Sequence, residues 1–152
     1  AAAEKWEEVS LVRTMMQERG VRKEPGRSWI EVDKKIHAFV VGDTSHPETK
    51  EIYAELSRLT EKIKAEGYLP DTRLVLHDID DKDKEFSLCS HSEKLAIAYG
   101  LMCTPSSKPV RVYKNLRVCS DCHAATKLIS KVTRKEIVVR DANRFHHFKD
   151  GL

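Results

Sequence analysis

The spacing of apolar residues predicts a helix at the start of the chain. Over residues 4–19 apolar side chains recur three or four positions apart, and Gly20 follows as a stop signal; the stripe is Trp6, Val9, Val12 and Met16. Leu11 and Met15 add a second apolar pair beside that stripe. We therefore expect this helix to pack on two sides, as the last helix of a preceding helical array would.

A second helix is predicted at about residues 46–66. Apolar residues recur there at helical spacing until Gly67, at Ile52, Leu56, Leu59 and Ile63. Ser45 and Glu48 match a capping box at its start, with Pro47 in the first turn.

Short apolar runs predict a β-hairpin between these two helices. Residues 28–32 and 36–41 are the expected strands, joined by a tight turn at 33–35. Beyond the second helix, residues 74–76 are a candidate short strand, and 78–83 form an acidic segment that is expected to be exposed.

The second half of the chain predicts a helix followed by strand, helix and strand. Apolar residues and one histidine share a stripe that faces the core, formed by Leu88, His91, Leu95, Ala98 and Met102. A strand at 110–114, a helix at 122–132 and a strand at 136–140 follow. This order implies a right-handed crossover between two parallel neighbours in one sheet.

Composition adds size and charge to this picture. A chain of 152 residues that is 40% apolar is most simply one globular domain with its own core. It contains no long uncharged apolar run, so neither a membrane span nor a signal peptide is expected, as in a soluble protein or a piece cut from one. From residue 108 onward the sequence contains eleven Lys and Arg but only four Asp and Glu, and this excess of positive charge suits binding to phosphates.

The four cysteines point to metal or redox chemistry more than to disulfides, because the chain shows no secretion signal. Cys119 and Cys122 form a C-x-x-C at the start of a predicted helix, where backbone N–H groups favour thiolates. Alone, this motif fits a redox dithiol, half of a zinc finger or part of an open zinc site. Cys89 and Cys103 lie in apolar surroundings and are expected to be core thiols.

The motif His91-Ser92-Glu93 favours one of these roles for the C-x-x-C, an open zinc site. His91 alone would more often be a core histidine, and Glu93 alone also fits a capping box that starts at Ser90. Together, one histidine and two cysteines supply three zinc ligands and leave a fourth position for water, with Glu93 as proton shuttle. H-x-E followed by C-x-x-C is the signature of zinc nucleobase deaminases, in which zinc-bound hydroxide attacks the base.

From Pro25 onward the sequence resembles the DYW domain of plant pentatricopeptide repeat proteins. The matching runs are 25–32 (PGRSWIEV), 91–96 (HSEKLA), 115–123 (NLRVCSDCH) and 141–148 (DANRFHHF). The resemblance implies an α/β fold, a cytidine-deaminase-like α-β-α sandwich whose mixed sheet starts with a β-hairpin and whose zinc site lies on two helices. Residues 1–24 then resemble the end of the helical extension motif, and 25–152 the domain itself.

The resemblance also implies a function. It implies zinc at His91, Cys119 and Cys122, with Glu93 as the catalytic residue, and conversion of cytidine to uridine in single-stranded organellar RNA. Upstream pentatricopeptide repeats would choose the target, other organellar editing factors are further candidate partners, and the location would be a plastid or a mitochondrion. No membrane partner is implied.

The sequence departs from the family at its end. The family tail C-x-C-x-D-Y-W does not occur in these 152 residues, which end at Leu152. The resemblance implies that this tail completes a second, structural zinc site together with two histidines. Here His123 and His146 are the candidates, with His147 as a weaker substitute, and a second zinc is expected only when the tail is present.

Two other functions fit the same motifs. A zinc-stabilised module could dock RNA or an editing partner without catalysing a reaction, and Glu93 is the residue that separates this hypothesis from the deaminase. Hydrolysis of RNA by the same zinc is a weaker alternative, because nothing in the sequence resembles the residues of a nuclease.

Overall fold

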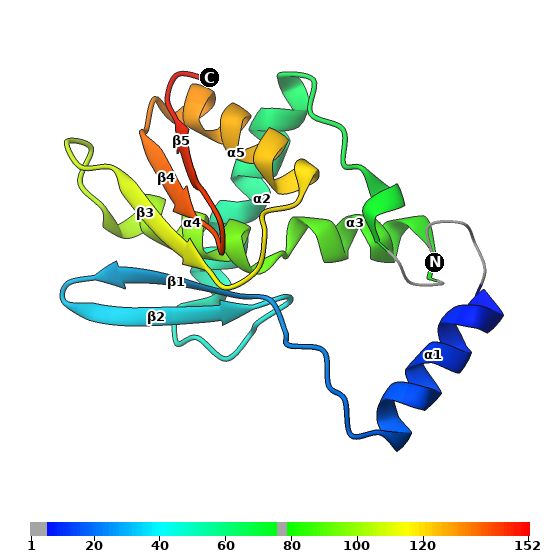
Figure 1. Ribbon diagram of the computed structural model, residues 1–152. Helices are drawn as coiled ribbons and strands as arrows, with labels where there is room; N and C mark the ends of the chain where they lie inside the picture. Colours follow the sequence, from blue (N-terminus) through cyan, green and yellow to red (C-terminus); the bar gives the residue numbers. More distant parts are fainter. Residues whose placement is uncertain (1–5, 76–78) are drawn as a thin grey trace.

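The computed structural model describes residues 6–75 and 79–152 (Figure 1). Its elements in chain order are α1 (Trp6–Glu18), β1 (Arg27–Val32), β2 (Lys35–Val40), α2 (Thr49–Ala65), the 3-10 turn η1 (Thr72–Leu74), α3 (Asp81–Cys89), α4 (Ser92–Cys103), β3 (Val110–Lys114), α5 (Ser120–Thr133), β4 (Ile137–Arg140) and β5 (Phe145–Phe148). No helix in the described ranges is long and apolar enough to cross a membrane.

The strands form one mixed sheet in the order β2-β1-β3-β4-β5. β3 and β4 are parallel and are joined through α5, as the sequence predicts, whereas the other neighbours are antiparallel. The hairpin between β1 and β2 turns on Asp33 and Lys34, which have φ angles of 51° and 64°. Positive φ at both central residues is the geometry of a two-residue hairpin loop, so Lys35 belongs to β2 and not to the turn.

α4, α5 and α2 lie on one face of this sheet (Figure 1). Buried side chains alternate along the strands and face the same side, as at Ile30, Val112 and Val139. α4 packs against β1, β2 and β3, and α2 packs in turn on α4 and α5. The α/β class, the mixed sheet and the initial hairpin are as expected. The layer order differs from the expected α-β-α sandwich, because α4 and α5 lie on the sheet and α2 lies on top of them, on the same side.

Gly100 allows α4 to lie close to the sheet. A Cβ atom at this position would lie 2.5 Å from Ile30 Cδ1 and 2.6 Å from a methyl group of Val110. Only a residue without a side chain fits between the helix and strands β1 and β3. This contact fixes α4, and with it the first turn of the helix, relative to the central strands.

α1 stands apart from the sheet at the end of an extended segment (Figure 1). Leu11 and Val12 are 62% and 54% exposed. The predicted helix is confirmed from Trp6 onward, and residues 4 and 5 lie outside the described residues. Its two-sided packing in a helical array stays a prediction.

Three local predictions are corrected. α2 begins at Thr49, and its N-cap is Glu48, whose side chain makes no capping hydrogen bond. The Ser45 hydroxyl donates to Asp43 instead of capping the helix, so the predicted capping box is wrong. Thr72–Leu74 is a 3-10 turn and not the start of a strand; Leu76 lies outside the described residues. The strand Phe145–Phe148 was not predicted, because its alternation is short and half polar.

Candidate metal centre

His91 sits at the break between two helices. The apolar stripe predicts one continuous helix through this region, but α3 ends at Cys89 and α4 begins at Ser92. His91 is the N-cap of α4, with φ −55° and ψ 143°, so its extended backbone turns the chain between the helices. Its side chain remains partly buried, whereas Met102 at the far end of the stripe is 37% exposed.

The two cysteines of the C-x-x-C lie at the start of α5. Cys119 is the N-cap of this helix, and its sulfur accepts the backbone N–H of Cys122 at 3.4 Å. Cys122 lies in the first turn and is fully buried. The helix N-terminus therefore stabilises negative charge on sulfur, as the sequence predicts.

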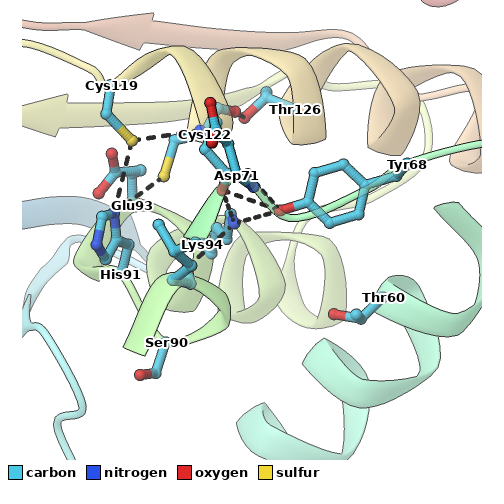
Figure 2. Close-up of polar contacts among 12 residues, drawn as sticks. Thr60, Tyr68, Asp71, Ser90, His91, Glu93, Lys94, Cys119, Cys122 and Thr126 are labelled. Atoms are coloured by element: carbon cyan, nitrogen blue, oxygen red, sulfur yellow. Dashed lines mark hydrogen bonds and ion pairs between the residues drawn. The ribbon is translucent and has the colours of Figure 1, made fainter. Parts of the chain in front are cut away.

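The three side chains converge although they come from the starts of two different helices, α4 and α5 (Figure 2). His91 Nδ1 lies 3.7 Å from the sulfur of Cys119 and 3.3 Å from the sulfur of Cys122. Zinc bonds of about 2.3 Å to sulfur and 2.05 Å to nitrogen place such ligands about 3.6 Å apart in a tetrahedron. With Glu93 included, the four ligand-type atoms lie within 4.8 Å of one another. The donor set and its spacing thus fit zinc.

The two thiols differ in how readily they lose a proton. Cys122 donates to Cys119 through its side chain and its backbone N–H, and these bonds lower the pKa of Cys119 to about 4. Burial raises the pKa of Cys122 well above its ordinary value. Without a metal, the pair therefore holds a thiolate at Cys119 beside a thiol at Cys122.

Glu93 is buried beside these ligands and is held by Lys114. Lys114 Nζ donates to Glu93 Oε1 at 2.6 Å, and the two side chains are 9% and 1% exposed. Burial raises the pKa of Glu93, but the Lys114 ammonium outweighs that effect and lowers it overall. The alternative interpretation of Glu93 as a helix cap is wrong, because the Ser90 hydroxyl donates to the carbonyls of Phe86 and Ser87.

A second buried ion pair lies on the other side of the C-x-x-C. Lys94 Nζ lies 2.7 Å from Asp121 Oδ2, and it also donates to Leu88 O and Tyr68 Oη at 3.0 Å each (Figure 2). The carboxylate of Asp121 additionally accepts from the hydroxyl of Tyr68 and from the backbone N–H of Asp71. Although burial lowers it, the pKa of Lys94 is raised overall by Cys122, Tyr68 and Asp121. The network ties α4 and α5 to the segment that follows α2.

An open pocket of about 670 Å³ leads to this centre. His91, Cys119 and Lys114 are among its lining residues, and the other charged residues of its wall are Lys23, Arg117 and Glu24. The remaining wall is mostly apolar, formed by Pro25, Val40, Val41, Leu74, Val75 and Leu116. Its size and its mostly apolar lining with a few polar groups are typical of small-ligand sites.

The histidines named for a second zinc lie near the end of the sheet. The rings of His123 and His146 have centroids 5.4 Å apart, and His146 Nε2 lies 2.8 Å from Asp141 Oδ2. His147 lies on the opposite face of β5 and contacts Glu136. In the part of the chain that the structure describes, the first centre is the only group of three or more residues suited to a metal. Cys89 and Cys103 are partly buried, and Cys103 packs against the core.

Two parts of the chain match known protein families. Residues 67–152 match the DYW family of nucleic acid deaminases, and residues 36–63 match the E+ motif. The chain belongs to the DYW family. The DYW match contains all four residues of the metal centre, and the E+ match contains most of β2 and α2.

Relatives of this DYW chain are pentatricopeptide repeat-containing proteins of Arabidopsis thaliana. It is 57% identical over its whole length to At4g33170, and 59% identical over 99% of its length to the chloroplastic At3g49170. It is also 50% identical over 99% of its length to the mitochondrial At2g03880. The chain spans only 15%, 18% and 24% of these proteins, so it corresponds to a small part of each.

Proposed function

We propose that this chain is a zinc-dependent cytidine deaminase that converts cytidine to uridine in single-stranded RNA of a plastid or mitochondrion. The observation that carries the proposal is the placement of Glu93 beside His91, Cys119 and Cys122 within 4.8 Å. Three ligands leave a tetrahedral ion one open position, and a carboxylate next to it can move protons.

His91 Nδ1 and the two sulfurs would hold the ion. Bound zinc would supply Lewis acidity and a water that loses its proton near neutral pH. The imidazole must be neutral to bind, and the start of α5 stabilises the thiolates. The Lys94–Asp121 pair packs beneath Cys122 and fixes the position of α5 relative to α4.

Glu93 would carry the protons of the reaction. Its Oε1 atom is held by Lys114, while Oε2 makes a long contact of 3.4 Å with the Ser92 hydroxyl. Oε2 would accept one proton from the attacking water and deliver it to the ring nitrogen, and would then move the second proton of that water to the departing amino group. Water and cytidine thereby give ammonia and uridine. A base in a duplex cannot reach such a pocket, so the substrate would be single-stranded or flipped out.

The domain division is part of this proposal. We assign residues 1–24 to the end of a helical extension and residues 25–152 to the DYW domain. The buried residues of α2, in the E+ match, belong to the same core as those of α4 and α5, which supports one unit from β1 onward. Pentatricopeptide repeats upstream would select the target, since such repeats read about one base each, and other organellar editing factors would assist.

The test is the substitution Glu93→Gln. A single-stranded oligoribonucleotide with one cytidine is incubated with zinc-loaded chain, uridine is measured by sequencing, and metal content is measured by mass spectrometry. We expect the wild type to form uridine and Glu93→Gln to retain zinc and fold but form none. Glu61→Gln on the exposed surface of α2 is the matched control and should remain active.

Two outcomes would contradict the proposal. Uridine formation by Glu93→Gln would remove Glu93 from catalysis. A wild-type chain that binds zinc and RNA but forms no uridine would favour the non-catalytic docking module instead.

A further inference from the structure

The sheet has an open face opposite the helices. Its side chains alternate with the buried ones, so strand register assigns them to one surface: Ile36, Ala38 and Val40 from β2; Arg27, Trp29 and Glu31 from β1; Arg111 and Tyr113 from β3; Val138 and Arg140 from β4; and Phe145 and His147 from β5. None of these residues is buried. We call this surface the open sheet face.

Aromatic side chains form a row across its central strands. Trp29 pairs with Tyr113, Tyr113 with Arg140, and Arg140 with Phe145. Adjacent strands lie about 4.8 Å apart, so these four side chains stand side by side on one line. Tyr113 and Phe145 are 45% and 72% exposed, and the Arg140 guanidinium lies 5.4 Å from the Phe145 ring centroid. Planar groups are thus presented to solvent in succession.

The charge of the open sheet face distinguishes it from a face that a helix would cover. Arg111 and Arg140 stand on the two central parallel strands and Arg27 lies on β1, while Glu31 is the one acid among the strand residues named above and Glu136, just before β4, contacts His147. Within residues 6–75 and 79–152 neither central guanidinium forms an ion pair. Burying them under an apolar helix would leave two charges without partners, which is costly. A polyanion would instead neutralise them.

The face is also hollowed where the arginines and rings meet. Tyr113, Arg140 and Phe145 line a hollow of about 270 Å³. Arg111 lines both this hollow and a second one of about 500 Å³, whose other charged residues are Lys34, Lys108, Glu31 and Asp33. Open sheet faces that combine exposed aromatic rings with basic side chains bind single-stranded nucleic acid, because each base can stack on a ring while phosphates contact the cations.

From these features we propose that the open sheet face binds single-stranded RNA. Bases stack on Trp29, Tyr113 and Phe145, and the backbone phosphates contact Arg111 and Arg140. The proposal extends the proposed function, because it names the surface that holds nucleotides flanking the target cytidine.

The metal centre lies at the adjoining end of the same strand. Lys114, which holds Glu93, directly follows Tyr113 in β3, and alternation places their side chains on opposite faces. Arg117 on the pocket wall lies a few residues further along the chain. A strand of RNA that leaves the pocket needs only to pass the end of β3 to reach the aromatic row.

The proposal is tested by RNA binding, independently of catalysis. Fluorescence anisotropy of a labelled twelve-nucleotide, unstructured oligoribonucleotide is measured with the purified chain in a Glu93→Gln background. Tyr113→Leu and Phe145→Leu keep side chains suited to strands but remove the rings, and each should raise Kd about fivefold or more. Arg140→Gln should reduce the slope of log K against log salt by about 0.7.

Two matched controls remove a ring or a positive charge at positions outside the open sheet face. Phe86→Leu removes a ring that is 62% exposed on α3, and Arg58→Gln removes one charge on α2; neither should change Kd. Thermal melts monitor folding. A second measurement leaves the open sheet face unchanged. In a Trp6→Phe chain Trp29 is the only tryptophan, and its fluorescence should be quenched when RNA bases stack on it.

The outcomes separate this proposal from the deaminase assignment. If the wild type is active, the face variants should raise KM for the twelve-nucleotide substrate but not for a trinucleotide, with kcat unchanged. A chain without uridine formation can still bind RNA through this face. Unchanged RNA affinity in the ring variants, with no quenching of Trp29, overturns the proposal; loss of self-association in those variants would then identify a protein-docking surface.

Discussion

Lys114 and Glu93 form a buried ion pair, with Lys114 Nζ 2.6 Å from Glu93 Oε1, and Lys114 also lines the candidate active-site pocket. The lysine comes from the end of β3 and the glutamate from the first turn of α4. The pair therefore couples the carboxylate that moves protons in the proposed reaction to the central strand of the sheet. A carboxylate held in this way can face the substrate through only one oxygen.

Substituting Lys114 should impair the proposed deamination without removing the metal ligands. Lys114→Met leaves Glu93 free to rotate, and misplacing a catalytic group by about 1 Å lowers rates about 100-fold. We expect kcat for uridine formation to fall about 10- to 100-fold while zinc content stays at the wild-type level. Lys114→Arg keeps the charge and should recover much of the rate. Equal rates in the Met and wild-type chains would show that Lys114 does not position Glu93.

The sequence contained a signal for Lys114 that motif searching did not use. Val110, Val112 and Lys114 alternate on one side of a strand, and the first two are core residues, so the lysine points to the same side. The motifs H-x-E and C-x-x-C identified the candidate ligands because they are local patterns. The lysine that holds Glu93 lies 21 positions away in the chain, and the supporting pair Lys94 and Asp121 is separated by 27 positions, so both contacts depend on tertiary packing.

Other features could not be read from periodicity alone. The break at His91 is hidden because apolar residues on either side keep helical spacing, and only the extended backbone of His91 separates α3 from α4. The open sheet face was not apparent either. Its row of residues comes from four strands, and register between distant strands is fixed by packing of the core face.

Removing Cys119 should abolish zinc binding. Cys119→Ala leaves one histidine and one thiolate, which are too few ligands for a stable site. We expect about one zinc per wild-type chain and almost none in the variant, together with loss of the stabilisation that zinc gives to the wild type in thermal melts. Cys89→Ala and Cys103→Ala, which lie outside the centre, should keep the metal. Wild-type zinc content in Cys119→Ala would contradict the ligand assignment.

Asp121 should be essential for stability although it is not a candidate ligand. Asp121→Asn leaves the ammonium of Lys94, whose side chain is 4% exposed, without a charged partner. Breaking a buried pair in this way destabilises proteins by about 3–5 kcal/mol. Urea denaturation of the metal-free chain should show that loss.

An exposed pair provides the comparison for Asp121. Glu66→Gln breaks the contact with Lys131, whose side chain is 54% exposed, and should change stability by less than about 1 kcal/mol. Similar stabilities for Asp121→Asn and Glu66→Gln would show that the buried network contributes little.

The metal-free chain should lose stability as pH falls through about 6.5, the ordinary histidine pKa. Burial, together with the nearby His46, lowers the pKa of His37, and burial with His146 lowers that of His123. His46 Nδ1 accepts the N–H of Glu48, so its Nε2 carries the proton that bonds His37 Nδ1 at 2.8 Å. The unfolded chain therefore binds more protons than the folded chain below that pH, and the difference persists until the folded histidines also titrate.

Thermal melts between pH 7.5 and 5.5, with a chelator present to exclude metal effects, measure this dependence. The melting temperature should fall with pH in the wild type. In His37→Phe, which retains a ring beside Tyr99 but cannot bind a proton, it should fall less. Ile36→Val, at an exposed neighbour in β2, should keep the wild-type slope. A slope unchanged by His37→Phe would mean that the histidine pair does not link protonation to folding, because that variant removes its proton acceptor.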